Sequence, residues 1–260
     1  MILAARCLVR LWLERLVAVQ VADRAVALAA LAFTVLIPLF IVYDALVPAL
    51  DRRDFATHLV DRFELNGAAA ASLRQALAPP DAVKQSVGVL GLVLVVVSAL
   101  SFARALQRMY EQAFRLSPIG GLRGAPATLL WLMLIPAYVV VRDIIGALVN
   151  GGPAAVLSIA LAALVWTATP VVLLGRRLSS RELLPTGIIT AFSMAALSAG
   201  TVVWMTHAVT DSANRYGLVG VAFAFLSWLV AAGFALVASA AAGAMWTEQH
   251  QNRAQPRQGG

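Results

Sequence analysis

The sequence predicts an all-α, polytopic membrane protein with six transmembrane helices. Of its 260 residues, 61% are hydrophobic and 13% are charged, and the mean hydropathy is +0.83. A water-soluble fold of this length could not hide so much apolar surface. The apolar residues form continuous runs, whereas the strands of a transmembrane β-barrel read as short alternating segments. The pattern predicts one transmembrane domain over residues 1–246 and a disordered cytoplasmic tail over residues 247–260.

Six apolar runs are long enough to cross the hydrocarbon of a bilayer, which takes about 20 helical residues. The second run continues into a basic segment with no helix-breaking residue, so the sequence predicts one long helix from Gln85 to Leu116. Proline interrupts the first, third and fourth runs, at Pro38, Pro136 and Pro170. Transmembrane helices tolerate proline with or without a binding site. The predicted spans are 25–50, 85–105, 125–149, 154–174, 186–209 and 218–246.

Two segments outside the spans have patterns of their own. In residues 1–24, Arg6, Arg10 and Glu14 recur every four residues and form one polar stripe, which favours a helix lying in the cytoplasmic interface. A simple cytoplasmic lead-in is an equally good interpretation, and the segment lacks the pattern of a cleavable signal peptide. Residues 51–84 carry balanced charges and two helical stretches separated by a turn. They predict an external helical hairpin that caps the bundle.

The distribution of charge predicts the orientation. Thirteen of the twenty basic residues, but only five of the thirteen acidic ones, fall in segments that this scheme places in the cytoplasm. The external segments hold six of each. Because cytoplasmic loops carry the excess of Lys and Arg, we expect a multi-pass protein of the cell inner (cytoplasmic) membrane with both termini cytoplasmic. The same positions explain the net charge of +7, so no nucleic-acid partner is expected.

Ionisable residues in the outer half of the bundle are candidates for a binding site, because charges inside a bilayer are costly. Asp44 in the first span and Arg142 in the third are expected at depths that differ by about 3 Å, at about 1.5 Å rise per residue. They can form a structural ion pair, or they can line an outward-facing polar cavity for a lipid head group or a solute. The candidate cavity residues are Asp44, Arg142, Asp143, His207 and Asp211.

Arginines at the inner ends of the spans are candidates for contact with lipid head groups. Arg104, Arg108 and Glu111 lie at i, i+4 and i+7 and share one helix face. A local salt bridge and an orientation signal are the plainer interpretation of this spacing. The inner-leaflet lipid-contact candidates are Arg104, Arg108, Arg115, Arg176 and Arg177.

No pattern of residues indicates an enzyme. The three histidines match no zinc spacing, and the single cysteine excludes an internal disulfide. The chain has one lysine and no glycine-rich phosphate loop, so neither a cofactor nor a metal is expected. The acidic residues form no cluster beside a basic face of the kind that a nuclease needs.

Three segments, residues 29–42, 87–114 and 216–244, carry a pattern that covers most of the chain in order. Its most specific parts are ARALQRMY at residues 103–110 and Tyr216-Gly217 leading to Trp228. In these segments the sequence resembles the YihY/BrkB family of bacterial inner-membrane proteins, formerly called ribonuclease BN-like. The resemblance implies a six-span fold and a role in envelope integrity that involves movement of lipid or glycolipid. It carries over no catalytic residue, and no residue here supports the ribonuclease label.

The expected function is therefore that of a non-enzymatic membrane protein that moves or positions lipids or a small solute, with membrane lipids as partners. The alternative is a scaffold protein of the envelope, with residues 51–84 as the surface for envelope-protein partners. The sequence carries no signal for the oligomeric state.

Overall fold

The structure is a computed structural model that describes residues 21–46, 88–149 and 151–254, together with residues 60, 67, 70, 71 and 74. Every regular element in these residues is a helix, which confirms the all-α prediction. Residues 1–20 of the predicted interfacial helix and most of the predicted cap over residues 51–84 lie outside the described residues. The elements are α2 (Val21–Leu46), α6 (Gly88–Ala113), the 3₁₀ helix η2 (Gly121–Gly124), α7 (Ala125–Leu148), α8 (Gly152–Leu173) and α9 (Ser180–Ala254).

Five helical stretches in the described residues are long and apolar enough to cross a membrane. Each overlaps one of the last five predicted spans. The first predicted span overlaps α2, a helix of 26 residues, but α2 is not one of the five, so the sixth crossing stays a prediction. The five stretches are Val93–Ala113, Ala125–Leu148, Gly152–Leu173, Ser180–Thr201 and Val219–Gln249.

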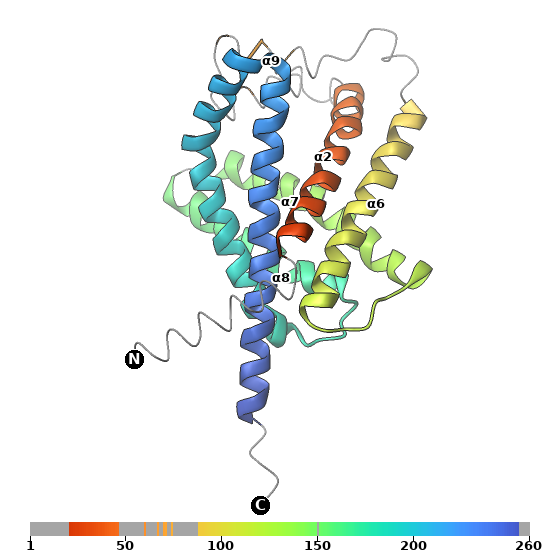
Figure 1. Cartoon of the computed structure of the whole chain (residues 1–260). Helices are drawn as coiled ribbons and strands as arrows, with labels where there is room; N and C mark the ends of the chain where they lie inside the picture. The colour runs from red at the N-terminus through yellow and green to blue at the C-terminus, as the bar shows by residue number, and fades with distance from the viewer. Residues whose placement is uncertain are drawn as a thin grey trace, which may run out of the picture. The chain divides into compact units, whose positions relative to one another are not determined.

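α9 is a hairpin of two helical arms that meet at a single residue. Gly217 alone has non-helical torsions, with φ 59° and ψ −137°, a conformation that residues with a Cβ rarely adopt. The chain reverses at this point (Figure 1). The predicted spans 186–209 and 218–246 leave residues 210–217 between them, but residues 210–216 are helical and the turn is confined to Gly217.

The second arm of α9 is also longer than the sequence indicated. Residues 247–254 fall in the predicted disordered tail, but they continue the helix to Ala254. Thr247 anchors this extension, because its Oγ1 donates a hydrogen bond to the carbonyl of Glu182, at 2.8 Å. A polar segment can thus stay helical where it packs on a neighbouring arm.

Contacts within the chain divide it into two compact units. Unit 1 combines Met1–Ala25, Ala103–Ala195 and Gly233–Gly260, and unit 2 combines Val26–Phe102 and Ala196–Ala232. Helices α2, α6 and α9 each contribute residues to both units.

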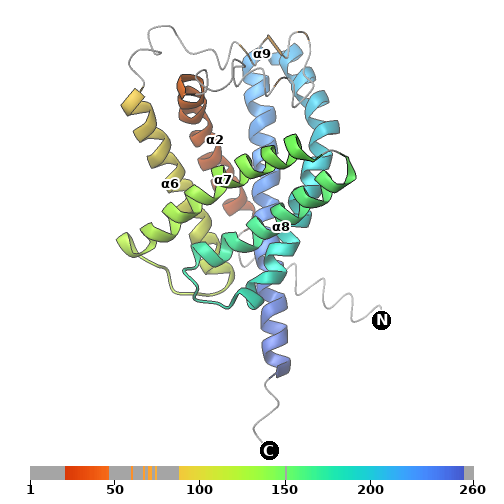
Figure 2. The same cartoon turned by 180° about the vertical axis from the view of Figure 1, so that it is seen from behind.

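In unit 1, α7 and α8 form an antiparallel pair (Figures 1 and 2). A hydrogen bond joins the two helices, because the indole Nε1 of Trp131 donates to Thr169 Oγ1 at 3.3 Å. The hydroxyl of Thr169 itself donates to the carbonyl of Val165, at 2.8 Å. Both side chains are buried, so these bonds satisfy polar groups that would otherwise lie in an apolar interior.

Glycines allow the helix backbones of unit 1 to come close together. A Cβ added to Gly187 would lie 2.4 Å from Thr167 Cα in α8, and one added to Gly243 would lie 2.7 Å from Thr186 Cα across the α9 hairpin. Real Cβ contacts essentially never fall under 3.0 Å. The small residues of the last two predicted spans therefore permit close helix packing, as they do in other membrane proteins.

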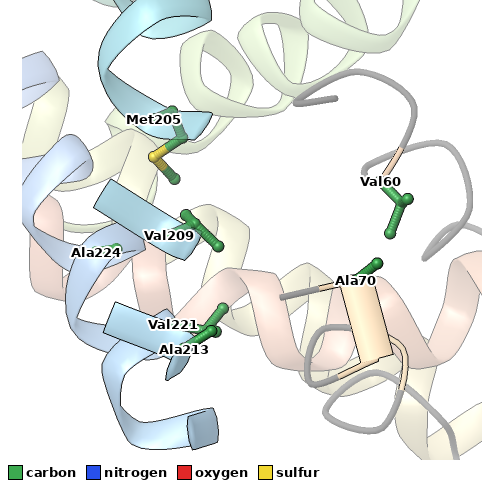
Figure 3. Packing of buried hydrophobic residues seen from close by; sticks show 7 residues of the cluster. All are labelled: Val60, Ala70, Met205, Val209, Ala213, Val221 and Ala224. Carbon is green, nitrogen blue, oxygen red and sulfur yellow. The ribbon is translucent and has the colours of Figure 1, made fainter. Parts of the chain in front are cut away.

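In unit 2, buried side chains cluster around the tip of the α9 hairpin (Figure 3). Trp228 packs against this cluster, and its Nε1 donates to Thr201 Oγ1 at 2.7 Å, which joins the two arms. Val60 and Ala70 are described residues of the predicted cap, so that segment supplies part of the cluster. The members are Val60, Ala70, Met205, Val209, Ala213, Val221 and Ala224.

Large apolar side chains are exposed along α7 and α8. Leu148 is 78% exposed and Met133 is 66% exposed in α7, and Val156 is 68% exposed in α8. Exposure of so much apolar surface to water would be unfavourable in free energy, whereas contact of the same surface with lipid tails is not. The exposed faces therefore agree with a membrane environment.

Candidate functional site

A cavity of about 190 Å³ lies beside the last turns of α6. Helix α6 contributes four polar side chains to it, because residues three or four apart lie on the same helix face. The loop after α6 and the end of η2 form the other wall, and all lining residues belong to unit 1. The lining residues are Arg104, Gln107, Arg108, Glu111, Pro118, Ile119, Gly120 and Gly124.

Glu111 is the buried acidic side chain of this cavity, with an exposed fraction of 2%. Its Oε1 accepts a hydrogen bond from the backbone N–H of Ile119, at 2.9 Å, and another from Nε2 of Gln107, at 3.1 Å. A buried carboxylate without such partners would be costly. The side chain thereby holds the loop against α6.

The second carboxylate oxygen of Glu111, Oε2, has a different environment. It accepts no hydrogen bond from the residues that the structure describes. It is not one of the fully buried side-chain atoms without a partner in this part of the chain, so it keeps some accessible surface. Because Glu111 lines the cavity, Oε2 is the carboxylate oxygen that a ligand there could bond.

Arg104 and Arg108 bring positive charge to the rim of the cavity. Both side chains are exposed, and among the described residues neither forms an ion pair with Glu111. The local salt bridge that the spacing allowed is not formed among the described residues. Both guanidinium groups line the cavity, where they can contact a ligand.

The backbone at the end of α6 fixes the loop as well. Arg115 has φ 53°, and its N–H donates to the carbonyl of Gln112, at 3.1 Å. The N–H of Leu116 donates to the carbonyl of Glu111, at 2.7 Å. These two bonds make a Schellman motif, with Arg115 at the position where glycine is usual. Both the side chain and the carbonyl of Glu111 therefore position the cavity wall.

The other arginines predicted to contact the inner leaflet lie outside the cavity. Arg115 forms an exposed ion pair with Glu248, with 3.9 Å between Nε and Oε1. Arg177 donates from Nη1 to the carbonyl of Ser117, which joins the loop after α8 to the loop after α6. Arg176 is exposed and has φ 59°. Of the five candidates, the structure brings only Arg104 and Arg108 into one site.

The described structure does not test whether the residues predicted to form an outward cavity meet. Arg142 and Asp143 are exposed on α7 in unit 1. His207 and Asp211 are exposed on the first arm of α9 in unit 2. Asp44 lies in the α2 helix, also in unit 2. The Asp44–Arg142 pair and the shared cavity therefore stay predictions.

Sequence reasoning did not identify Gln107 or the role of Glu111 in holding the loop. The available signal was the position of Gln107, four residues before Glu111, which puts an uncharged polar side chain on the same face. The loop sequence PIGG at residues 118–121 was a second signal, because its glycines let backbone N–H groups approach a side chain. Neither signal shows by itself that the carboxylate is buried.

Comparison with known proteins shows the family. The model of the Virulence factor BrkB family matches residues 12–259. No curated protein and no solved structure matched the chain. The family match covers nearly the whole chain and includes both units and the cavity beside α6. The chain therefore belongs to the Virulence factor BrkB family.

Proposed function

We propose that the chain is a six-span protein of the cytoplasmic membrane that moves or positions lipids, with both termini in the cytoplasm. The single observation that carries the proposal is the cavity beside α6, where two arginines that form no ion pair with Glu111 lie at the end of a candidate membrane-spanning helix. The exposed apolar faces of α7 and α8 supply the lipid contact that such a role needs. No reaction and no cofactor belong to the proposal.

The position of the cavity along α6 supports this assignment. Arg108 lies five residues before Ala113, the last residue of the candidate span Val93–Ala113. At a rise of about 1.5 Å per residue this is about 8 Å, which a long arginine side chain can bridge to the interface. If Ala113 lies at the inner boundary, the Arg108 guanidinium group reaches the phosphates of the inner leaflet.

The outer polar residues are a second place where a lipid head group or solute could bind. Arg142 and Asp143 are exposed on α7, in a stretch that is otherwise apolar. Charged side chains in such a stretch are costly unless they face a partner, a cavity or the interface. We propose that Arg142 and Asp143 bind a lipid head group or a solute at this place on α7.

A reconstitution experiment tests lipid movement. The purified full chain would be placed in phosphatidylcholine vesicles that contain a tail-labelled fluorescent phospholipid, and a membrane-impermeant quencher would be added outside. We expect quenching to exceed that in protein-free vesicles, since inner-leaflet lipid would reach the outside. The double substitution Arg104→Gln/Arg108→Gln should reduce this excess, and Arg123→Gln, which is exposed but does not line the cavity, should not. Quenching equal to that in protein-free vesicles would contradict lipid movement.

The alternative function is a scaffold of the cell envelope. The observation that favours it is the burial of Val60 and Ala70 in the cluster at the tip of the α9 hairpin, which holds part of residues 51–84 on the protein. A segment anchored in this way can present its opposite side to envelope proteins. Crosslinking in cells tests this, because a chain without residues 51–84 should lose its crosslinked partners while it remains in the membrane.

A further inference from the structure

We propose that the cavity beside α6 binds the phosphoethanolamine head group of a phospholipid, with Arg104 and Arg108 on the phosphate and Glu111 on the primary amine. This inference deepens the proposed function and rests on it for the location of the cavity at the inner leaflet. It adds a preference among lipids, which the proposed function does not specify.

The arginines provide the phosphate half of the site. Arg104 and Arg108 line the same cavity at i and i+4 of α6, and neither forms an ion pair with Glu111 in the described part of the chain. Guanidinium groups bind phosphate oxygens through charge-assisted and often bidentate hydrogen bonds. Two of them on one wall suit a phosphodiester, which carries a single negative charge.

Glu111 provides the half of the site that binds the amine. A purely anionic head group would bring its charge close to a buried carboxylate, which is unfavourable in a site of low dielectric constant. A head group that carries a protonated amine would instead donate a hydrogen bond to Oε2, the carboxylate oxygen that accepts no hydrogen bond from the described residues. Because Oε1 already accepts from Ile119 and Gln107, the carboxylate is held in place before the ligand arrives.

The same geometry separates three common phospholipids. Phosphatidylethanolamine has a primary amine that can donate to Glu111. Phosphatidylcholine has a quaternary amine, which is positive but has no N–H to donate. Phosphatidylglycerol has no positive charge in its head group. We therefore expect affinity to fall in that order, with the phosphate contacts common to all three.

Native mass spectrometry of the detergent-solubilised full chain tests this order. The protein would be titrated with short-chain phosphatidylethanolamine, phosphatidylcholine and phosphatidylglycerol. We expect phosphatidylethanolamine to bind at least about tenfold more tightly than phosphatidylglycerol, which is the scale of one charge-assisted hydrogen bond. Equal affinities, or tighter binding of phosphatidylglycerol, would overturn the proposal.

Substitutions assign the two halves. Glu111→Gln keeps a carbonyl oxygen for Ile119 and Gln107 but replaces Oε2 by an amide that cannot accept. We expect it to abolish the preference for phosphatidylethanolamine while phosphatidylglycerol still binds, which also shows that the variant is folded. Arg104→Gln/Arg108→Gln should weaken all three lipids about tenfold, and Arg123→Gln should change none. Loss of both lipids in Glu111→Gln, or an unchanged preference, would overturn the role of Glu111.

Competition separates a lipid from a free metabolite. Free phosphoethanolamine and inorganic phosphate would be added to the lipid-bound protein. The proposal expects displacement only at concentrations far above those of the lipid, because the acyl chains contribute to binding. Displacement at equal concentration would show a site for a free phosphate ester and overturn the lipid assignment. Lipid binding with the expected order but no lipid movement in vesicles would leave this inference standing and reject the transport part of the proposed function.

Discussion

At the scale of single residues, Glu111 links the fold to the candidate site. Its carbonyl accepts the Schellman bond from Leu116, and its carboxylate accepts from Ile119 and Gln107. Spacing alone placed Glu111 with Arg104 and Arg108 on one face of α6, and that part of the sequence prediction agrees with the cavity lining. The burial of Glu111 depends on how the loop of residues 117–120 packs against α6. The spacing of residues along a helix does not specify how a following loop packs, so the sequence could not predict this burial.

Replacement of Glu111 by alanine should destabilise the protein. The change leaves the buried amide of Gln107 and the N–H of Ile119 without their acceptor, at a cost of about 1–3 kcal/mol. The apparent melting temperature of the full chain in detergent should therefore fall. Gln112→Ala, at an exposed neighbouring position, is the matched control, and an equal melting temperature for both variants would contradict the role of Glu111 in holding the loop.

Substitution by glycine should affect the stability of the protein less favourably inside a helix than at Arg115. Arg115 has φ 53° at the end of α6, where glycine has no Cβ penalty, and its ion pair with Glu248 is exposed and contributes little. We expect Arg115→Gly to leave the stability unchanged or raise it by up to about 1 kcal/mol. Arg108→Gly, inside α6, should lower it by about 1 kcal/mol. Thermal unfolding of the two variants, measured side by side, checks that Arg115→Gly is the more stable of the two.

At the scale of helices, apolar runs predicted the elements well and their ends less well. The third span was predicted at 125–149 and α7 is Ala125–Leu148; the fourth was predicted at 154–174 and α8 is Gly152–Leu173. Both arms of α9 extend further than predicted, and in the second arm Thr247 of this extension donates a hydrogen bond to the carbonyl of Glu182 in the first arm. The length of an apolar run predicts the part of a helix that can lie in lipid. It does not predict helical turns made of polar residues at either end.

The close approach of α8 to the first arm of α9 should be sensitive to one methyl group. Gly187→Ala would place a Cβ 2.4 Å from Thr167 Cα, so the backbones must separate. Such overpacking costs about 1–3 kcal/mol, which should appear as a lower melting temperature. Gly200→Ala is the matched control, since nothing lies within 4 Å of its added Cβ. Equal melting temperatures for the two variants would show that these helices are not in close contact.

At the scale of the whole molecule, composition and charge predicted the class, and the match of the BrkB family over residues 12–259 agrees with it. The six-span topology with both termini in the cytoplasm is still a prediction, as is the outward cavity. Asp44, Arg142 and His207 lie on three helices. Whether they meet depends on how those helices rotate about their axes, and residue order does not specify that rotation.

Reporter fusions test the topology. Alkaline phosphatase fused to the chain is active only outside the cytoplasm. Green fluorescent protein fluoresces only in the cytoplasm, because it does not fold after export in the unfolded form. We expect fusions at both ends of the chain to be fluorescent and to lack phosphatase activity. A fusion after Lys84, in the predicted external segment, should show the reverse. Termini on opposite sides would reject the six-span scheme and also the placement of Arg108 at the inner leaflet.

The hairpin of α9 has a consequence for biosynthesis. Its arms meet at Gly217 alone, and residues 202–218, which separate the candidate spans on the two arms, number 17. A segment this short brings few polar groups across the hydrocarbon with it. We therefore expect the two spans to insert together as a helical hairpin while the chain is still being synthesised.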